Sequence, residues 1–232
     1  MIKVAPPPAP QDFDDKVRKP GMGFLAKHPD PTNALWRTHR YWKHAHQQLY
    51  DSLGGICSYC SSFTPRKRDD SGLDHTSIDH FIPKSREKNL AYEWSNYRLC
   101  RTRLNNRKGD FNDVIDPYVV DDGLFRFNFG NFFIVPDAGL SEEEKERVAA
   151  SIQRLGLNED ESYVNERARV IYAYVDGSMS FDIVTRFYPF IALEIATQDF
   201  DRNHMPIFKR ALSNNNVRQA LVQQGILQEV QS

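Results

Sequence analysis

The sequence predicts an α+β protein in which a small strand–strand–helix module is set in a mostly helical chain. Two strand patterns and a helix pattern follow one another between residues 78 and 111, and a β-hairpin pattern follows at residues 124–135. Most of the remaining chain carries apolar residues at helical spacing, which is typical of helices that bury one face. Strands that cluster in this way among helices indicate the α+β class.

Three regions follow from this order of elements. Residues 1–31 hold seven of the thirteen prolines, and because proline donates no backbone hydrogen bond, we expect an extended arm and not a packed element. Residues 32–120 contain a helix and the strand–strand–helix module. Residues 121–232 contain the β-hairpin and a helical C-terminal region.

The composition describes an ordinary soluble protein. Hydrophobic residues make up 40% and charged residues 26% of the 232 residues. No run approaches the roughly 20 apolar residues that a membrane helix needs, and the first residues lack the apolar stretch of a signal peptide. We therefore expect a cytoplasmic chain that does not associate with membranes. The odd number of three cysteines argues against a disulfide framework.

The net charge of -1 conceals an uneven distribution. Residues 84–110 contain eight Lys and Arg against three Asp and Glu, whereas residues 137–166 contain three against nine. A local basic stretch suits a phosphate-binding face. On charge alone, the sequence favours two solvated faces of opposite sign.

Local patterns place the individual elements. Before the module, Asn33–Leu53 reads as an amphipathic helix, which Thr32 or Asn33 can cap and Gly54-Gly55 can end. Its other face carries Arg37, Arg40, Lys43 and His44. Such a face can contact nucleic acid, but we expect it to be solvated. The module's elements are strands at Ile78–Lys84 and Trp94–Cys100 and a helix at Leu104–Phe111.

Beyond the module, the segments Leu124–Phe129 and Phe132–Val135 flank Gly130-Asn131 as a hairpin. Ser141 and Glu144 form the pattern of a capping box for a helix that ends near Gly156. Further helices are expected at Asn158–Val175, at Phe181–Phe200 with a kink at Pro189, and at Val217–Gln224.

The dipeptide Asp79-His80 carries groups that phosphodiester hydrolysis needs. That reaction requires a base to deprotonate water and positive charge to stabilise the transition state. The ordinary pKa of histidine lies near neutrality, so His80 can be the base. Neighbouring residues of a regular strand point to opposite sides, and a bend or a strand end is needed for both to serve one site. Without further context, such a dipeptide is more often structural.

The residues that follow supply this context. Asn96 lies 16 residues after His80, Asn105 nine residues after Asn96, and Lys108 three further on. Asn96 can bond to backbone groups across the turn and brace the loop that aims His80. Asn105 offers a neutral oxygen ligand and Asp79 a charged one, which leaves positions on a divalent metal for water and phosphate. A turn-forming Asn96 and a helix-capping Asn105 are structural readings compatible with these roles.

Together these segments resemble the HNH, or ββα-metal, nuclease motif. The resemblance rests on Ile78–Ser85, Tyr92–Leu99 and Asn105–Asp110, and it is close to the bacterial group that includes the nuclease subunits of Septu-type and retron-linked phage defence. Asp116-Pro117, Leu155–Asn158 and Arg167 also fall where that group tends to have such residues.

The resemblance implies a metal-dependent endonuclease that hydrolyses DNA, with RNA open as a substrate and a function in anti-phage defence. It makes His80 the general base, Asp79 and Asn105 the ligands of Mg²⁺ or Mn²⁺, and Asn96 the residue that orients the base. Relatives often work beside an ATPase, which implies such a partner. Six basic residues are candidates for phosphate contacts: Lys84, Arg98, Arg101, Arg103, Arg107 and Lys108.

One departure concerns zinc. Many relatives carry two cysteine pairs that bind a structural zinc, and Cys57-Ser-Tyr-Cys60 matches the first pair. The second pair would fall near Arg101 and Leu104, neither of which can ligate zinc. Cys100 and His75 would complete four ligands only at an irregular spacing. We expect buried free thiols at Cys57 and Cys60 and no structural zinc.

The main rival function is a non-catalytic subunit of a larger complex, which binds nucleic acid or a partner and retains the motif as a relic. The presence of all four motif residues argues against it. A further reading is an adaptor that docks through the Pro-rich arm and the acidic segment, and this role can coexist with nuclease activity.

Overall fold

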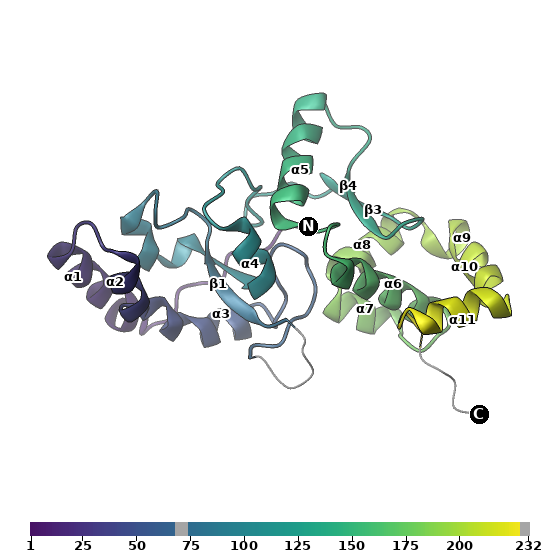
Figure 1. The fold of residues 1–232 in the computed structure, drawn as a ribbon, viewed down its shortest axis with the longest axis horizontal. Helices are drawn as coiled ribbons and strands as arrows, with labels where there is room; N and C mark the ends of the chain where they lie inside the picture. The colour runs from purple at the N-terminus through teal and green to yellow at the C-terminus, as the bar shows by residue number, and fades with distance from the viewer. Residues whose placement is uncertain (68–73, 228–232) are drawn as a thin grey trace. The chain divides into compact units, whose positions relative to one another are not determined.

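The computed structural model describes residues 1–67 and 74–227 and divides the chain into two compact units (Figure 1). Unit 1 consists of Met1 and Lys3–Asp121, and unit 2 of Ile2 and Asp122–Ser232. Each unit is described by itself. The second and third regions expected from the sequence include residues 68–73 and 228–232, which lie outside the described residues.

Each unit combines one pair of antiparallel strands with helices, so the α+β class is confirmed. The strand pairs are β1 with β2 in unit 1 and β3 with β4 in unit 2. Among the described residues, no helix is both long enough and apolar enough to cross a membrane.

The N-terminal segment corrects the prediction of an extended arm. Residues 14–18 form a π-helical turn that leads into α1 (Lys19–Lys27). Pro20 lies in the first turn of α1, directly after the π-helical turn. Four buried side chains of this segment belong to the core of unit 1: Phe13, Val17, Phe24 and Leu25.

The next helix is interrupted, contrary to the single helix predicted for residues 33–53. It consists of α2 (Asn33–Thr38), a 3₁₀ segment (Tyr41–Ala45) and α3 (His46–Ser52). The ring of His39 at the break stacks on the ring of Phe24 with 4.0 Å between centroids. This contact with α1 outweighs the helical pattern.

Both ends of the predicted helix are nevertheless where the sequence places them. The side chain of Thr32 accepts a hydrogen bond from the backbone N–H of Leu35, as an N-cap does. Gly54 and Gly55 both have positive φ angles and follow the C-cap residue of α3, Leu53.

Unit 1 contains the predicted strand–strand–helix module. Strand β1 (Thr76–His80) pairs antiparallel with β2 (Tyr97–Arg101), and α4 (Thr102–Lys108) follows β2 directly. Between the strands lie two 3₁₀ segments, Lys88–Tyr92 and Trp94–Asn96. The order is as predicted, but β1 ends four residues earlier than Lys84, and the second strand starts only at Tyr97 because residues 94–96 turn.

In the core of unit 1, α1 lies very close to the 3₁₀ segment Lys88–Tyr92. A Cβ atom added to Gly21 would lie 2.1 Å from the ring of Tyr92, whereas one added to Gly23 would meet nothing within 4 Å. The Tyr92 side chain is fully buried and lies near the rings of Trp36 and Trp42. The absence of a side chain at Gly21 is therefore required for this packing.

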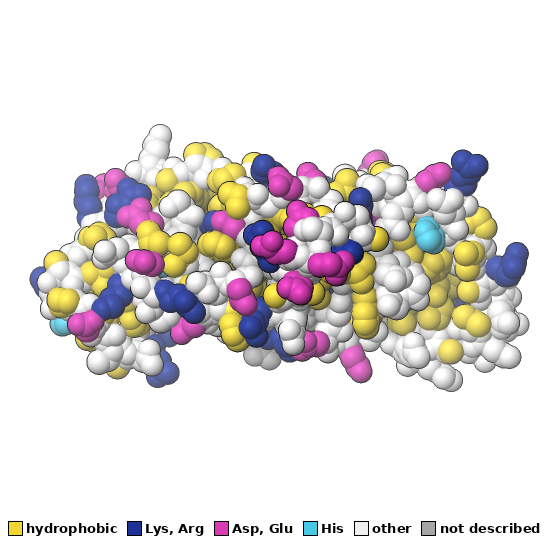
Figure 2. Space-filling model, turned by 90° about the horizontal axis from the view of Figure 1, so that it is seen from above, with side chains coloured by type: hydrophobic (Ala, Val, Ile, Leu, Met, Phe, Trp, Pro, Cys, Tyr) yellow, Lys and Arg dark blue, Asp and Glu magenta, His cyan; other side chains and the backbone are white. Residues whose placement is uncertain are grey.

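Unit 2 begins with the predicted hairpin, β3 (Phe125–Asn128) and β4 (Phe133–Pro136). Helix α5 (Glu142–Leu155) starts with the capping box of Ser141 and Glu144 and ends at Gly156, as predicted. In Figure 2, Asp and Glu side chains gather over the outer end of α5, whose first turn carries three glutamates.

The later helices of unit 2 agree with the sequence in part. Helix α6 spans Glu161–Val175 and is capped by Asp160. The predicted helix over 181–200 breaks at Tyr188 into α7 (Phe181–Phe187) and α8 (Pro189–Thr197), because proline starts a new helix more easily than it continues one. Three further helices follow: α9 (Phe200–Asn203), α10 (Met205–Leu212), which the sequence did not predict, and α11 (Asn215–Gln223).

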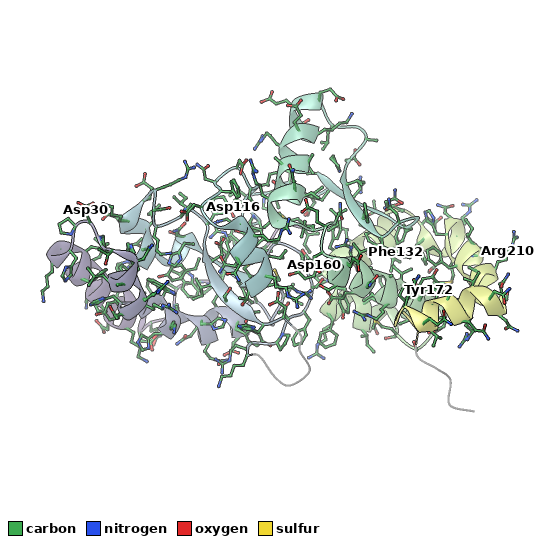
Figure 3. The ribbon with its side chains drawn as sticks, in the orientation of Figure 1. Asp30, Asp116, Phe132, Asp160, Tyr172 and Arg210 are labelled. Atoms are coloured by element: carbon green, nitrogen blue, oxygen red, sulfur yellow. The ribbon has the colours of Figure 1, made fainter. Side chains whose placement is uncertain are left out.

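Helix α8 is tied to the hairpin by a buried carboxylate. The carboxylate of Glu194 accepts a hydrogen bond from the backbone N–H of Phe127 at 2.8 Å, and it forms an ion pair with Arg126 at 3.3 Å. Aromatic rings pack around the hairpin turn. There the ring centroids of Phe132 and Tyr172 (both labelled in Figure 3) lie 6.0 Å apart.

The close approach at Gly21 gives a matched pair of substitutions. We expect Gly21→Ala to destabilise unit 1 by about 1–3 kcal/mol, because the methyl group must displace a buried ring. Gly23→Ala should stabilise it by about 0.5–1 kcal/mol through helix propensity. All three tryptophans lie in unit 1, so urea unfolding followed by tryptophan fluorescence reports on this unit. Equal shifts of the urea midpoint in the two variants would contradict the close packing of Gly21 against Tyr92.

Candidate functional site

The residues at the end of β1 face a pocket of about 290 Å³ on unit 1. The motif residues Asp79, His80 and Asn105 all line it. Its other lining residues are Trp42, Ile78, Pro83, Lys84, Asn106, Gly109 and Asp110. The strand end at His80 is what allows the adjacent Asp79 and His80 to serve one pocket, as the sequence requires.

His80 is held in one orientation by its surroundings. Its Nε2 lies 3.0 Å from the carbonyl oxygen of Ala91, which can only accept, so Nε2 carries the hydrogen and Nδ1 is left as the acceptor. The rings of Trp42 and Tyr97 stand perpendicular to the imidazole at 4.8 and 5.4 Å. These contacts fix both the tautomer and the ring plane.

The electrostatic environment keeps His80 neutral. Burial lowers the pKa of His80 to about 3, assisted by the positive charges of Lys84 and Lys108 and opposed by the bond to Ala91. At neutral pH the imidazole therefore has a free lone pair on Nδ1. The neutral imidazole can accept a proton, but its low pKa makes it a weak base.

Asn96 makes the bridging bonds that the sequence predicts. Its Oδ1 accepts from the N–H of Ile82 at 2.8 Å, and its Nδ2 donates to the carbonyls of Ile82 and Leu90. Its backbone carbonyl also accepts from Phe81 at 2.9 Å. The buried Asn96 thus ties the loop after His80 to the segment before Ala91, whose carbonyl holds the imidazole.

Asp79 is buried, and each of its carboxylate oxygens accepts one hydrogen bond. The Tyr59 hydroxyl donates to Oδ2 at 2.5 Å, and the Lys108 ammonium donates to Oδ1 at 3.1 Å. A carboxylate oxygen has two lone pairs, so acceptor capacity remains on both.

Asn105 approaches the same strand from α4. Its Nδ2 donates to the Ser77 hydroxyl at 2.9 Å and to the carbonyl of Ile78 at 3.1 Å. Among the described residues, no hydrogen bond engages its Oδ1.

The donor set fits a hard divalent cation. A carboxylate from Asp79 and an amide oxygen from Asn105 line one pocket, and both are ligands that Mg²⁺ and Mn²⁺ accept. In residues 1–67 and 74–227 there is no group of three or more His, Cys, Asp or Glu side chains that could hold a metal. A two-ligand site leaves the remaining coordination positions to water and phosphate.

Three of the six predicted phosphate contacts need correction, because their side chains are buried and bonded within unit 1. Lys108 is fully buried, and its ammonium bonds to Asp79 and to the carbonyls of His80 and Phe81. Arg98 forms a two-pronged ion pair with Asp116 (labelled in Figure 3) at 2.7 and 2.6 Å.

The buried guanidinium of Arg101 donates to the hydroxyl of Thr64 at 2.8 Å and to the carbonyl of Phe63. Lys84, Arg103 and Arg107 remain accessible. Lys84 is half-buried and lines the pocket, whereas Arg103 and Arg107 are exposed on α4. They lie four residues apart, so they share one face of the helix.

Sequence reasoning missed two side chains of the site. Tyr59, which contacts Asp79, lies inside the Cys57–Cys60 segment, where the sequence pattern indicates only the two cysteines as possible ligands. Trp42, which contacts His80, lies in the segment for which the sequence predicts only an amphipathic helix. All three cysteines are buried and none forms a disulfide. Burial raises the pKa of the Cys57 thiol to about 12, which keeps it protonated.

A scan against protein-family models and a search of curated proteins find no match for this chain.

The position of Lys108 gives a second pair of variants. Lys108→Met keeps the length of the side chain but leaves the buried Asp79 without its counter-ion, and we expect a loss of about 3–5 kcal/mol. Lys43→Met, at an exposed position of the same unit, should change stability little. Urea unfolding followed by tryptophan fluorescence measures both. Equal midpoints would contradict a structural role for Lys108.

Proposed function

We propose that the chain is a metal-dependent endonuclease of the HNH type that hydrolyses phosphodiester bonds of DNA. The observation that carries the proposal is the convergence of His80, Asp79 and Asn105 on one pocket, with a neutral imidazole fixed at its edge. Residues from three separate positions in the sequence build this arrangement: Asp79-His80, Asn96 and Asn105. It supports the resemblance that their spacing indicates.

In the proposed reaction, Nδ1 of His80 takes a proton from a water molecule. The hydroxide attacks phosphorus, and the opposite P–O bond breaks, with the leaving oxygen protonated by solvent. Asp79 and Asn105 would hold a divalent ion, whose positive charge would stabilise the transition state. Lys84 lies close enough to lower the pKa of His80 and can contact the phosphate. A phosphate anion in the pocket offsets that effect and strengthens the base.

One observation favours the rival function, a non-catalytic subunit that binds nucleic acid. Both oxygens of Asp79 already accept hydrogen bonds from Tyr59 and Lys108. A metal must share this carboxylate with two donors.

Nicking of supercoiled plasmid by the purified chain, with Mg²⁺, with Mn²⁺ and with EDTA, separates the two functions. We expect nicking only with a metal, and a loss of about 10²–10⁴-fold in His80→Ala because the base is removed. The control is His44→Ala, an exposed histidine of the same unit. Wild-type chain that binds DNA but never nicks it would establish the rival, and equal rates in the two variants would remove His80 from the mechanism.

The corrected set of basic residues predicts where DNA binds. In a His80→Ala background, replacing Lys84, Arg103 and Arg107 together with Ala should weaken DNA binding and reduce the salt slope by roughly 0.9 for each lost phosphate contact. The control replaces three exposed basic residues that lie before or within the 3₁₀ segment Tyr41–Ala45: Arg37, Arg40 and Lys43. DNA affinity measured against salt concentration decides. A reduced slope in the control alone would place the DNA on that other face.

A further inference from the structure

The hydroxyl of Tyr59 makes a short hydrogen bond to the carboxylate of the proposed metal site. It donates to Oδ2 of Asp79 at 2.5 Å, and both side chains are buried. Nothing in the general requirements of phosphodiester hydrolysis calls for a tyrosine here. The hydrogen bond from Tyr59 to Asp79 therefore has a role that those requirements do not explain.

The segment that carries Tyr59 is fixed independently of Asp79. The N–H of Cys57 donates to the carbonyl of Ser62 at 3.0 Å, closing the turn. The N–H of Ser58 donates to the carbonyl of Leu99 at 2.8 Å, and the thiol of Cys57 accepts from the N–H of Arg101 at 3.4 Å. The last two bonds join the turn to β2, the strand paired with the one that carries Asp79.

The two oxygens of Asp79 are held by donors from different segments. Tyr59 binds Oδ2 from the Cys57–Cys60 turn, and Lys108 binds Oδ1 from the end of α4. Rotation of the carboxylate would break both bonds and leave buried polar groups unpaired, which is costly.

We propose that Tyr59 is a positioning residue of the metal site: its hydroxyl, with Lys108, fixes the Asp79 carboxylate in the orientation in which it binds a divalent ion. The inference rests on the proposed function, because it takes Asp79 as a metal ligand. Residues that hydrogen-bond to metal ligands restrict the ligand's orientation, and their loss typically weakens metal binding 10–100-fold. The Cys57–Cys60 turn then serves as the rigid support of Tyr59.

The test is calorimetric titration of the full chain with Mn²⁺. Tyr59→Phe removes the hydroxyl and keeps the ring, and we expect it to raise the Kd for Mn²⁺ about tenfold or more. The matched control is Tyr92→Phe, which removes another hydroxyl of unit 1, one that donates to the carbonyl of His39 at 2.9 Å and lies outside the pocket lining. It should bind Mn²⁺ as the wild type does. Circular dichroism and tryptophan fluorescence establish that each variant is folded.

The outcomes separate this inference from the proposed function. If Tyr59→Phe binds Mn²⁺ as tightly as wild type while Asp79→Ala loses binding, the metal site stands and the positioning role of Tyr59 is overturned. A lower stability of Tyr59→Phe with an unchanged Kd has the same meaning, since only packing is then affected. If the wild-type chain binds no Mn²⁺ at millimolar concentration, the metal assignment fails and the inference fails with it.

Discussion

The ammonium group of Lys108 is the contact on which the rest of the site depends. It joins the last turn of α4 to the carboxylate of Asp79 and to the carbonyls of His80 and Phe81. It thereby neutralises a buried carboxylate and supplies donors to carbonyls at the point where β1 ends. Without this charge, the strand end would carry unpaired polar groups in the interior of unit 1. The bend that brings Asp79 and His80 to one pocket is built around it.

Burial of the site has two opposite effects on its proposed chemistry. It removes water from His80 and fixes the imidazole, so that a single nitrogen is available as a base. The same burial lowers the basicity of that nitrogen. In the proposed reaction, a substrate phosphate near Lys84 would offset the part of the pKa shift that comes from that positive charge, whereas the larger part that comes from burial would remain.

The sequence predicted elements with local signals and missed those set by tertiary contacts. The capping box at Ser141, the turn glycines after α3 and the hairpin around Gly130 are recognisable from a few neighbouring residues. The break at His39 depends on its stacking against Phe24, which no local pattern reveals. In the site, spacing indicated His80 and Asn96. Charge alone could not tell exposed Arg103 from buried Arg98, since their difference lies in the partner Asp116.

The packing of α1 against Tyr92 has a consequence for the newly made chain. The helix carries Phe24 and Leu25, whose partners include residues that are synthesised some 70 positions later. Until those residues have left the ribosome, α1 has only its nearer partners, such as Trp36 and His39, which contact Phe24. Contacts of such sequence separation slow folding and leave apolar surface open to aggregation. The side of α1 that packs against Tyr92 therefore reaches its native environment only after residue 92 has been made.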